Sequence, residues 1–523
     1  MSPPRIHEWI AAHRKGRAMM IPKRLHRSSL LTVGVLLCVC GVGLIVLGET
    51  TAPASAQDGE PYYVDADYLG ADECSACHRN VVRTHAGTAH ALTLAEPGRR
   101  GEGVLADFEV GADIRTMQFP EEDAPRAFEL DDVAFILGVG RSKQAYVYEE
   151  GRRDYRVLPA QWNVSAGAWE PLSLAASWDD PAYDFETACA ACHTTGFNAE
   201  RLRWKDTGVT CESCHGPGSE HEEVARDEGR NPDEEGLARI AAVIASGADS
   251  QACGQCHSRA TGPDGQAYAA GYRPGMALSD VFMQVEFTGE SDVHWWVSGH
   301  GRQINMQYTE WALSAHAGRA EDGSEIAGCT ACHDPHSDAG MTANLVAESD
   351  ALCVTCHTSS AGGRPSKEMY EGVAVVDTVL PLVGVHFAVE DGPTCTSCHM
   401  PQVPVDGGTR TSHRFEPVLA FGVEGLPDAC SACHGSQAEP ALIEQLIADI
   451  QTSTAERLEA ARALVTATTP AWIVQALDFV EDDGSLGMHN YAYADALLDA
   501  VDKALGLYDT ETAAVTPASG AGQ

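Results

Sequence analysis

Hydrophobic and polar positions alternate in one early part of the chain, as they do in β-strands. Residues 133–140, 143–150 and 153–160 show this alternation, and Gly151 with Arg152 separates the last two runs. A period of two residues with a glycine between the runs predicts a β-hairpin or small sheet. We therefore expect a small β insert here.

Apolar positions recur at helical intervals in other parts of the chain. Residues 440–451, 455–468 and 492–505 repeat apolar side chains every three or four positions and carry acidic residues between them, which predicts amphipathic helices. Residues 222–248 predict an acidic pair of surface helices. The rest is largely aperiodic. These patterns indicate a mostly α-helical protein with long loops, the small β insert and a helical C-terminal subdomain.

The first 56 residues have the pattern of an export signal. Basic residues dominate positions 1–28, an uncharged apolar run covers 30–48, and small residues at 54–56 fit the signal-peptidase rule. The apolar run is nearly long enough to span a bilayer, so the segment is either a cleaved signal or a retained anchor. Either alternative predicts an exported protein, periplasmic or extracellular, whose mature chain would start at Gln57.

Every cysteine beyond this segment belongs to one short motif. Sixteen of the 18 cysteines form eight copies of Cys-x-x-Cys followed at once by His. We number the copies as sites 1 to 8 in chain order. They are Cys74-Cys77-His78, Cys189-Cys192-His193, Cys211-Cys214-His215, Cys253-Cys256-His257, Cys329-Cys332-His333, Cys353-Cys356-His357, Cys395-Cys398-His399 and Cys430-Cys433-His434.

This motif has the residues that attach a haem covalently. Two thiols three positions apart can add to the two vinyl groups of one porphyrin, and the adjacent imidazole can bind its iron as the proximal ligand. Disulfides and zinc sites also use paired cysteines, but neither requires a histidine after every second cysteine. The sequence therefore predicts eight c-type haems, which would form the core around which the chain is organised.

The motifs also divide the mature chain. Site 1 lies in residues 57–100, and sites 2 to 8 lie in a multihaem region at 189–436. Between them, 101–188 is a haem-free insert that contains the predicted strands. Residues 437–508 form the helical C-terminal subdomain, and 509–523 are expected to be a disordered tail.

Eight irons need up to eight further axial ligands, and ten other histidines remain in the mature chain. If each iron carries a second imidazole, no iron can bind a substrate. His221 and His336 lie too close to the preceding motif to reach the opposite face of its haem, so each is expected to serve a neighbour. The distal candidates are His90, His221, His300, His316, His336, His386, His413 and His489, with His294 and His85 in reserve.

The charge balance limits the choice of partner. Asp and Glu number 75 against 35 Lys and Arg, which gives a formal net charge of −40. Such a surface repels the phosphate backbone, so nucleic acid is excluded. It favours instead a redox protein that presents a basic docking face. Contact with a membrane is expected only through an uncleaved N-terminal segment.

Several segments resemble known haem proteins beyond the motif itself. YLGADECSACH and GTAHA, then FETACAACHTTGF and TGVTCESCHGPGSEH, resemble the tetrahaem cytochrome c that accepts electrons from hydroxylamine oxidoreductase. This resemblance runs from residue 68 to residue 260. In that family the His of the TAHA-like segment is an axial ligand, which implies the same role for His90.

The later segments resemble a second group. CHDPHS, DGPTCTSCHMP, SHRF and the GMHNYAYADALL helix are similar to the octahaem and pentahaem superfamily of hydroxylamine oxidoreductase and the tetrathionate and nitrite reductases. The resemblance implies distal roles for these histidines, haems stacked in parallel and perpendicular pairs, and C-terminal helices that make oligomer contacts. The C-x-x-C-K motif of the nitrite reductases does not occur in this chain.

Three functions remain open from the sequence. Ten spare histidines for eight irons favour an electron-transfer cytochrome, for which no catalytic residue is predicted. The alternatives are an oxidoreductase of nitrite, hydroxylamine or tetrathionate with one open haem, and a subunit of a cytochrome filament. The sequence does not decide whether the protein is an enzyme, because fold resemblance does not establish activity.

Overall fold

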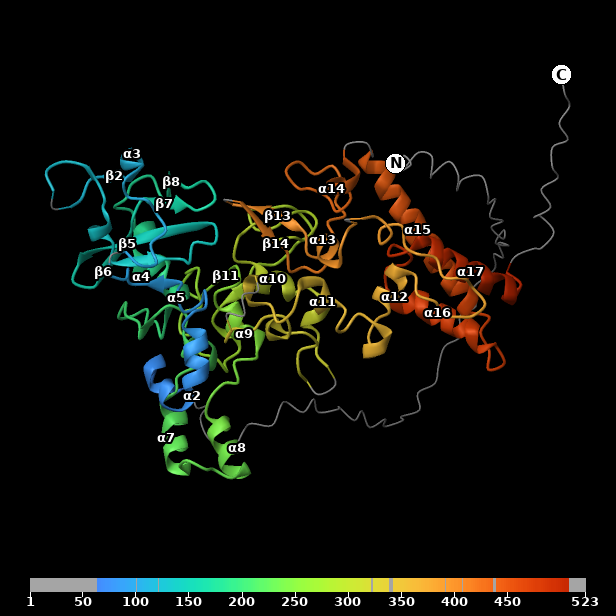
Figure 1. Cartoon of the computed structure of the whole chain (residues 1–523), viewed down its shortest axis with the longest axis horizontal. Coiled ribbons are helices and arrows are strands. Elements are labelled where there is room, and N and C mark those ends of the chain that lie inside the picture. The colour runs from blue at the N-terminus through green and yellow to red at the C-terminus, as the bar shows by residue number, and fades with distance from the viewer. Residues whose placement is uncertain are drawn as a thin grey trace, which may run out of the picture.

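The computed structural model describes residues 64–507, apart from 100, 121, 321–322, 338–341, 391, 407 and 436–438. The molecule is elongated, with a β-rich end, a central region that carries the motifs and a group of helices at the other end (Figure 1). The predicted export signal and the predicted C-terminal tail lie outside the described residues. Within the described part, no helix combines the length and apolar character that a membrane crossing requires.

The β-rich end is built on one antiparallel six-stranded sheet, where the sequence predicted a β-hairpin or small sheet. Its strand order is β1-β4-β5-β7-β8, and β6 pairs with the other end of β5. The predicted hairpin between β5 and β6 is confirmed, with Arg153 at a positive φ of 61° in its turn. The strands are β1 (Leu94–Ala95), β4 (Phe135–Leu137), β5 (Lys143–Gly151), β6 (Asp154–Val157), β7 (Ala160–Asn163) and β8 (Ala168–Pro171).

Both faces of this sheet are buried. Tyr146 and Val147 are adjacent in β5 and therefore point to opposite faces, yet each is fully buried. Tyr146 packs in a cluster with Phe128 and Trp169, whereas Val147 packs in a second cluster with Phe185. The second cluster also contacts Cys189 of site 2. The insert therefore has a hydrophobic core of its own and borders the first motif of the multihaem region.

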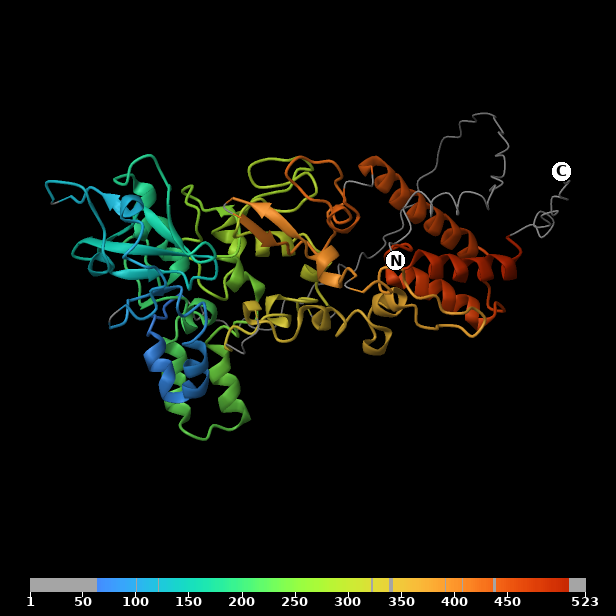
Figure 2. The same ribbon diagram turned by 45° about the horizontal axis from the view of Figure 1, so that its top comes forward.

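Short helices and two-stranded ribbons hold the motifs. Three of them, α2, α7 and α8, project together from one side of the molecule (Figure 2). The helices are α2 (Ala71–His85), α3 (Ala112–Arg115), α4 (Phe185–Ala188), α5 (Ala190–His193), α6 (Cys211–His215), α7 (Ser219–Glu228), α8 (Glu234–Ala242), α9 (Ser250–Gly254), α10 (Gln307–Trp311), α11 (Ser349–Cys353), α12 (Ser366–Glu371), α13 (Cys395–His399) and α14 (Ser431–His434). The ribbons pair β2 (Thr116–Met117) with β3 (Arg126–Ala127), β9 (Thr194–Thr195) with β10 (Asp206–Thr207), β11 (Ala260–Thr261) with β12 (Met283–Gln284), and β13 (Gln402–Val405) with β14 (Gly408–Thr411). Single 3₁₀ turns lie at η1 (Leu130–Asp132), η2 (Pro181–Tyr183), η3 (Leu278–Asp280), η4 (Ala315–Ala317), η5 (Cys329–Ala331), η6 (Thr342–Asn344) and η7 (Ser359–Ala361).

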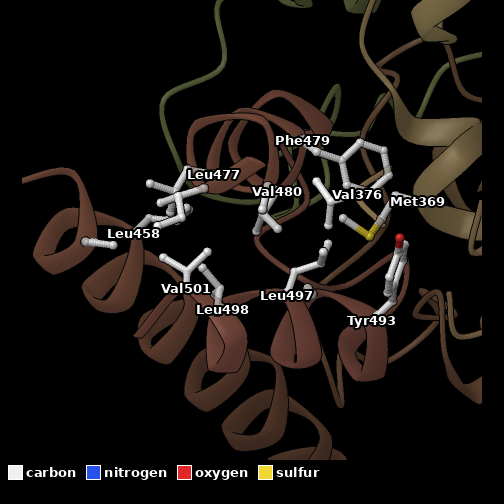
Figure 3. Packing of buried hydrophobic residues seen from close by; sticks show 14 residues of the cluster. Met369, Val376, Leu458, Leu477, Phe479, Val480, Tyr493, Leu497, Leu498 and Val501 are labelled. Carbon is white, nitrogen blue, oxygen red and sulfur yellow. The ribbon is translucent and has the colours of Figure 1, made fainter. Parts of the chain in front are cut away.

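Three longer helices form the C-terminal end: α15 (Pro440–Arg462), α16 (Ala471–Asp483) and α17 (Tyr491–Leu505). Leu477 of α16 and Leu497 of α17 are fully buried in their shared cluster, which Figure 3 shows from close by. The two helices expected between residues 440 and 468 are one continuous helix, and α16 was not predicted.

The centre of the molecule has less apolar packing than its two ends. The described residues form only two small clusters there, one around Tyr272 and Phe282, the other around Val403 and Val418. Burial of apolar side chains is the main stabilising contribution in an ordinary domain. The central region therefore needs another source of cohesion.

Candidate haem sites

Each motif has the same local geometry. In site 4 the backbone N–H of His257 donates to the carbonyl of Cys253 at 2.9 Å, and the equivalent bond closes sites 2, 5, 6 and 8. This single helical turn brings the two cysteines, three positions apart, to one face with the histidine next to them. The local sequence is enough to form such a turn, since all the residues involved lie within five positions.

In the described residues, the motif cysteines form neither a disulfide nor a bare metal cluster. All sixteen motif cysteines are free thiols. In the described part of the chain, no group of three or more His, Cys, Asp or Glu side chains converges in a way that could hold a metal ion. The thiols therefore remain available for thioether bonds, and the geometry does not favour the zinc and disulfide alternatives.

Seven of the eight proximal histidines face a second imidazole from a distant segment. The ring centres lie between 5.9 and 6.3 Å apart in every case. The pairs, from site 1 onward, are His78 with His221 at 6.3 Å, His215 with His336 at 5.9 Å, His257 with His90 at 6.1 Å, His333 with His413 at 6.3 Å, His357 with His316 at 6.1 Å, His399 with His489 at 5.9 Å and His434 with His386 at 6.3 Å.

The constancy of this distance indicates a common cause. The angle between the two rings varies from 9° for His215 with His336 to 75° for His90 with His257, while the separation barely changes. Two imidazoles on opposite faces of one metal, each with a nitrogen about 2 Å from it, have ring centres about 6 Å apart and can rotate freely about the axis. The residues present therefore fit a haem iron between the two rings.

Hydrogen bonds orient the rings for this role. The Nδ1 atoms of His215 and His333 donate to the carbonyls of Ala245 and Ala343 at 2.9 and 2.8 Å. On the opposite side, Nδ1 of His221 bonds the carbonyl of Ile240 at 3.0 Å. Metal-binding histidines typically donate their second N–H in this way, which fixes the tautomer. Nε2 is then the unprotonated nitrogen that can bind a metal.

Burial keeps these imidazoles neutral. Desolvation, followed by the charge of His257, lowers the pKa of His90 to about 4. Desolvation likewise lowers the pKa of His413 to about 4, although Glu310 opposes the shift. Because a histidine must be deprotonated to bind a metal, these shifts keep the ligands competent at neutral pH.

The distal partners come from the segments that the sequence suggested, with one exception. His221 and His336 lie opposite sites 1 and 3, and not opposite the motifs that immediately precede them. His300 differs, because its Nδ1 contacts Ser298 Oγ at 2.8 Å and its Nε2 contacts the carbonyl of Glu416 at 3.0 Å. Both ring nitrogens are therefore occupied by protein oxygens, which does not agree with the distal role predicted for His300.

Site 2 is the exception among the proximal histidines. Nδ1 of His193 lies 2.9 Å from Thr93 Oγ1, but in the described chain no second imidazole ring stands opposite it. Of the reserve candidates, His85 lies near the His215–His336 pair, whose charges, after burial, lower its pKa. Nδ1 of His294 is buried without a hydrogen-bond partner.

The motifs contact one another in an order that differs from the chain order. Helix α2 of site 1 packs on α6 of site 3, and α6 packs on α9 of site 4. Beside α9, the backbone N–H of Cys329 in site 5 donates to Ser250 Oγ at 3.0 Å. Farther along, α11 of site 6 contacts α13 of site 7, where Thr396 N donates to Asp350 Oδ1 at 3.1 Å.

The thiols support these neighbour relations. Hydrogen bonding between thiols of different motifs shifts the thiol pKa values in four pairs: Cys74 with Cys211, Cys192 with Cys256, Cys253 with Cys329, and Cys353 with Cys395. The second pair places site 2 beside site 4. Charges also act between sites 5 and 6 and between sites 7 and 8, where Cys356 and Cys433 contribute, after burial, to the raised pKa values of Cys332 and Cys398.

Three family models match different parts of the chain. The cytochrome c552 model matches residues 382–499, a doubled CXXCH motif matches 316–362, and the cytochrome c554 and c-prime model matches 168–216. The chain is a multihaem c-type cytochrome. The predicted resemblance is confirmed at this level, and electron transfer is the activity that such cytochromes share.

Solved structures agree with this assignment. The crystal structure of the outer cell wall cytochrome OcwA is similar to this cytochrome with a TM-score of 0.65 and 25% identity, covering 84% of this chain and 99% of OcwA. An undecaheme cytochrome from the S-layer of Carboxydothermus ferrireducens has a TM-score of 0.49 at 19% identity, covering 85% and 70% of the two chains. The Wolinella succinogenes octaheme sulfite reductase MccA has 0.43 at 15%, covering 87% and 84%. The last two are too distant to carry a functional argument. A search of the curated proteins finds no match.

Proposed function

We propose that this cytochrome is an exported octahaem electron carrier, with one haem on each motif and two imidazoles on the iron at seven of the eight sites. The seven ring pairs at 5.9–6.3 Å carry the proposal. An iron with two imidazoles has no position left for a substrate, so such a site can only gain and lose electrons. Bound haem supplies the one-electron centre, and the chain holds neutral imidazoles on both sides of it.

The motif contacts support a haem order of 1–3–4–5–6–7–8, with site 2 as a branch beside site 4. In Figure 1, α9 of site 4 lies nearer to the β-rich end than α11 of site 6, and α11, α13 and α14 of sites 6 to 8 follow one another across the long axis. Covalent attachment at closely packed motifs keeps neighbouring centres near each other. The arrangement therefore suits conduction through the central region, from site 1 to site 8.

The export pattern and the charge suggest where the protein works. Haem attachment through thioethers and the N-terminal pattern both favour a location outside the cytoplasm, and the similar protein OcwA is an outer cell wall cytochrome. The formal charge of −40 favours a redox partner with a basic docking face. The rate of electron exchange with such a partner should fall as salt screens the attraction between the two charged surfaces.

Haem counting and paramagnetic resonance on the full mature chain test the proposal. A pyridine haemochrome assay should give eight haems per chain, and the ferric spectrum should show low-spin signals for the paired sites. His221→Ala should convert one low-spin haem to high-spin while all eight haems remain. The matched control is His85→Ala, which removes an unpaired histidine in the same region and should change nothing. A spectrum unaffected by His221→Ala would contradict the proposed ligation.

The surroundings of His193 in site 2 favour a second candidate function. Its ring has no imidazole opposite it in the described residues, unlike the other seven proximal rings. An open position at the site 2 iron would allow binding of nitrite, hydroxylamine or a sulfur oxyanion, and the other seven haems would then deliver or remove electrons.

Ligand binding separates the two candidates. A native ferric spectrum with one high-spin haem that binds cyanide or nitrite would support the second function. His294→Ala is the decisive variant, because the buried Nδ1 of His294 is unpartnered. If the native protein is entirely low-spin and His294→Ala creates the high-spin signal, then His294 is the missing ligand and electron transfer alone remains.

A further inference from the structure

One distal imidazole differs from the others in its hydrogen-bond partner. Nδ1 of His489, opposite site 7, lies 2.6 Å from Oδ1 of Asp483, whose side chain is completely buried. Where the structure gives another of the paired rings a hydrogen-bond partner at its second nitrogen, that partner is a neutral oxygen, such as the Thr411 carbonyl at His413 or the Phe415 carbonyl at His399. Nδ1 of His316 has no such partner. Site 7 thus combines a carbonyl on its proximal side with a carboxylate on its distal side.

The carboxylate is held firmly in this position. Asp483 is the last residue of α16, and its Oδ2 accepts hydrogen bonds from both the N–H and the hydroxyl of Ser485. The backbone N–H of His489 donates to the same hydroxyl at 3.1 Å. The turn after α16 therefore fixes the acid and the imidazole relative to each other. No sequence pattern singled out Asp483, because it lies six positions from the histidine and belongs to an acidic run.

We propose that Asp483 is a positioning residue that makes the haem of site 7 the low-potential member of the array. A carboxylate that accepts the N–H of a metal-bound imidazole raises the basicity of that ligand. A more basic ligand stabilises ferric over ferrous iron, and the buried negative charge acts in the same direction. The inference rests on the proposed ligation of site 7 by His399 and His489.

The chain contains a natural comparison at site 3. The distal candidate His336 also has an aspartate beside it, but Nδ1 of His336 and Oδ1 of Asp334 are 3.9 Å apart. The two side chains are 48% and 43% exposed. At this distance and exposure there is no hydrogen bond, and solvent screens the charge. Loss of Asp334 should therefore leave its haem almost unchanged.

Spectroelectrochemical titration of the full holoprotein tests the inference. Asp483→Asn keeps the shape of the side chain and removes its charge. It should raise one midpoint potential by at least about 59 mV, which is a tenfold change in a one-electron equilibrium constant. Asp334→Asn is the matched control and should shift none by that much. Equal shifts in both variants, or no shift in Asp483→Asn with eight haems retained, would overturn the inference.

Paramagnetic resonance of the native protein separates this inference from the ligation on which it rests. The low-spin signal of site 7 is the one that His489→Ala removes. In a reductive titration of the native protein followed by paramagnetic resonance, that signal should be the last to disappear, because the haem of lowest potential is reduced last. If His489→Ala removes no signal, the proposed ligation fails. If it removes a signal that disappears before the others in the titration, only the role of Asp483 fails, and this test does not require any Asp483 variant to fold.

Discussion

The ion pair between Glu310 and Arg410 should be the most sensitive point of the central region. The two side chains are 0% and 5% exposed, with Nη1 of Arg410 and Oε2 of Glu310 2.7 Å apart. The carboxylate also accepts the backbone N–H groups of Gly301 at 2.6 Å and His413 at 2.7 Å. It therefore joins α10 and β14 and holds the backbone of the proposed distal ligand at site 5.

Arg410→Met removes the cation and keeps most of the apolar stem. Glu310 is then a buried charge with two amide donors and no counter-ion, a change that costs about 3–5 kcal/mol when one partner of a buried pair is lost. Adding Glu310→Gln to this variant removes the isolated charge while an amide oxygen can still accept a backbone N–H. The double variant should therefore recover much of the lost stability, even though it has one charge fewer.

Native-state hydrogen exchange at the amides of Gly301 and His413 measures this effect locally. The control is Arg226→Met, since Arg226 is 71% exposed beside Glu222 and such a pair contributes about 0–1 kcal/mol. The reasoning is refuted if Arg410→Met costs no more than Arg226→Met, or if adding Glu310→Gln brings no recovery.

Three further predictions concern pH and the C-terminal helices. Burial would raise the pKa of Glu310, but its ion pair with Arg410 and its backbone donors lower that pKa below the ordinary 4.5. The hydrogen-exchange protection of the two amides that donate to Glu310 should therefore be constant above about pH 4.5 and fall only as the pH drops through the lowered pKa. Arg457→Met should destabilise the α15–α17 contact by about 3 kcal/mol in urea unfolding, because it removes one partner of the buried ion pair with Asp502, which is 7% exposed. Arg462→Met, at a more exposed cluster, should cost about 1 kcal/mol or less. Leu477→Ala should cost about 2–5 kcal/mol in the same assay, since the side chain is fully buried, and a cost below 1 kcal/mol would contradict the described packing.

The parts of the fold that follow local rules could be predicted from the sequence. The β5–β6 hairpin and the helices near 440 and 492 follow from periodicity and turn residues. Helix α16 could not be predicted in this way, because α12, α15 and α17 all contact it and its buried positions cover a wide face. The expected break after residue 451 is also absent, since Thr454 is buried in the continuous α15, beside Gly487.

The candidate haem sites also have one part that follows local rules and another that depends on the fold. A motif closes within five residues, so the sequence identifies every proximal candidate. The distal pairings depend on tertiary structure: His78 and His221 are far apart in the chain, and only the fold brings their rings to 6.3 Å. His300 was preferred over His294 on local context alone, and local context could not reveal that Ser298 and Glu416 occupy both of its nitrogens.

The ring pairs also explain how the central region can hold together. Each pair joins segments that are well separated in sequence, such as His90 with His257 and His399 with His489. The large apolar clusters lie at the two ends of the molecule, in the insert and in the C-terminal helices. Metal binding by ligands from distant segments contributes directly to folding free energy. If the proposed ligation is correct, the same imidazoles that carry the electron path also cross-link the part of the chain that apolar packing stabilises least.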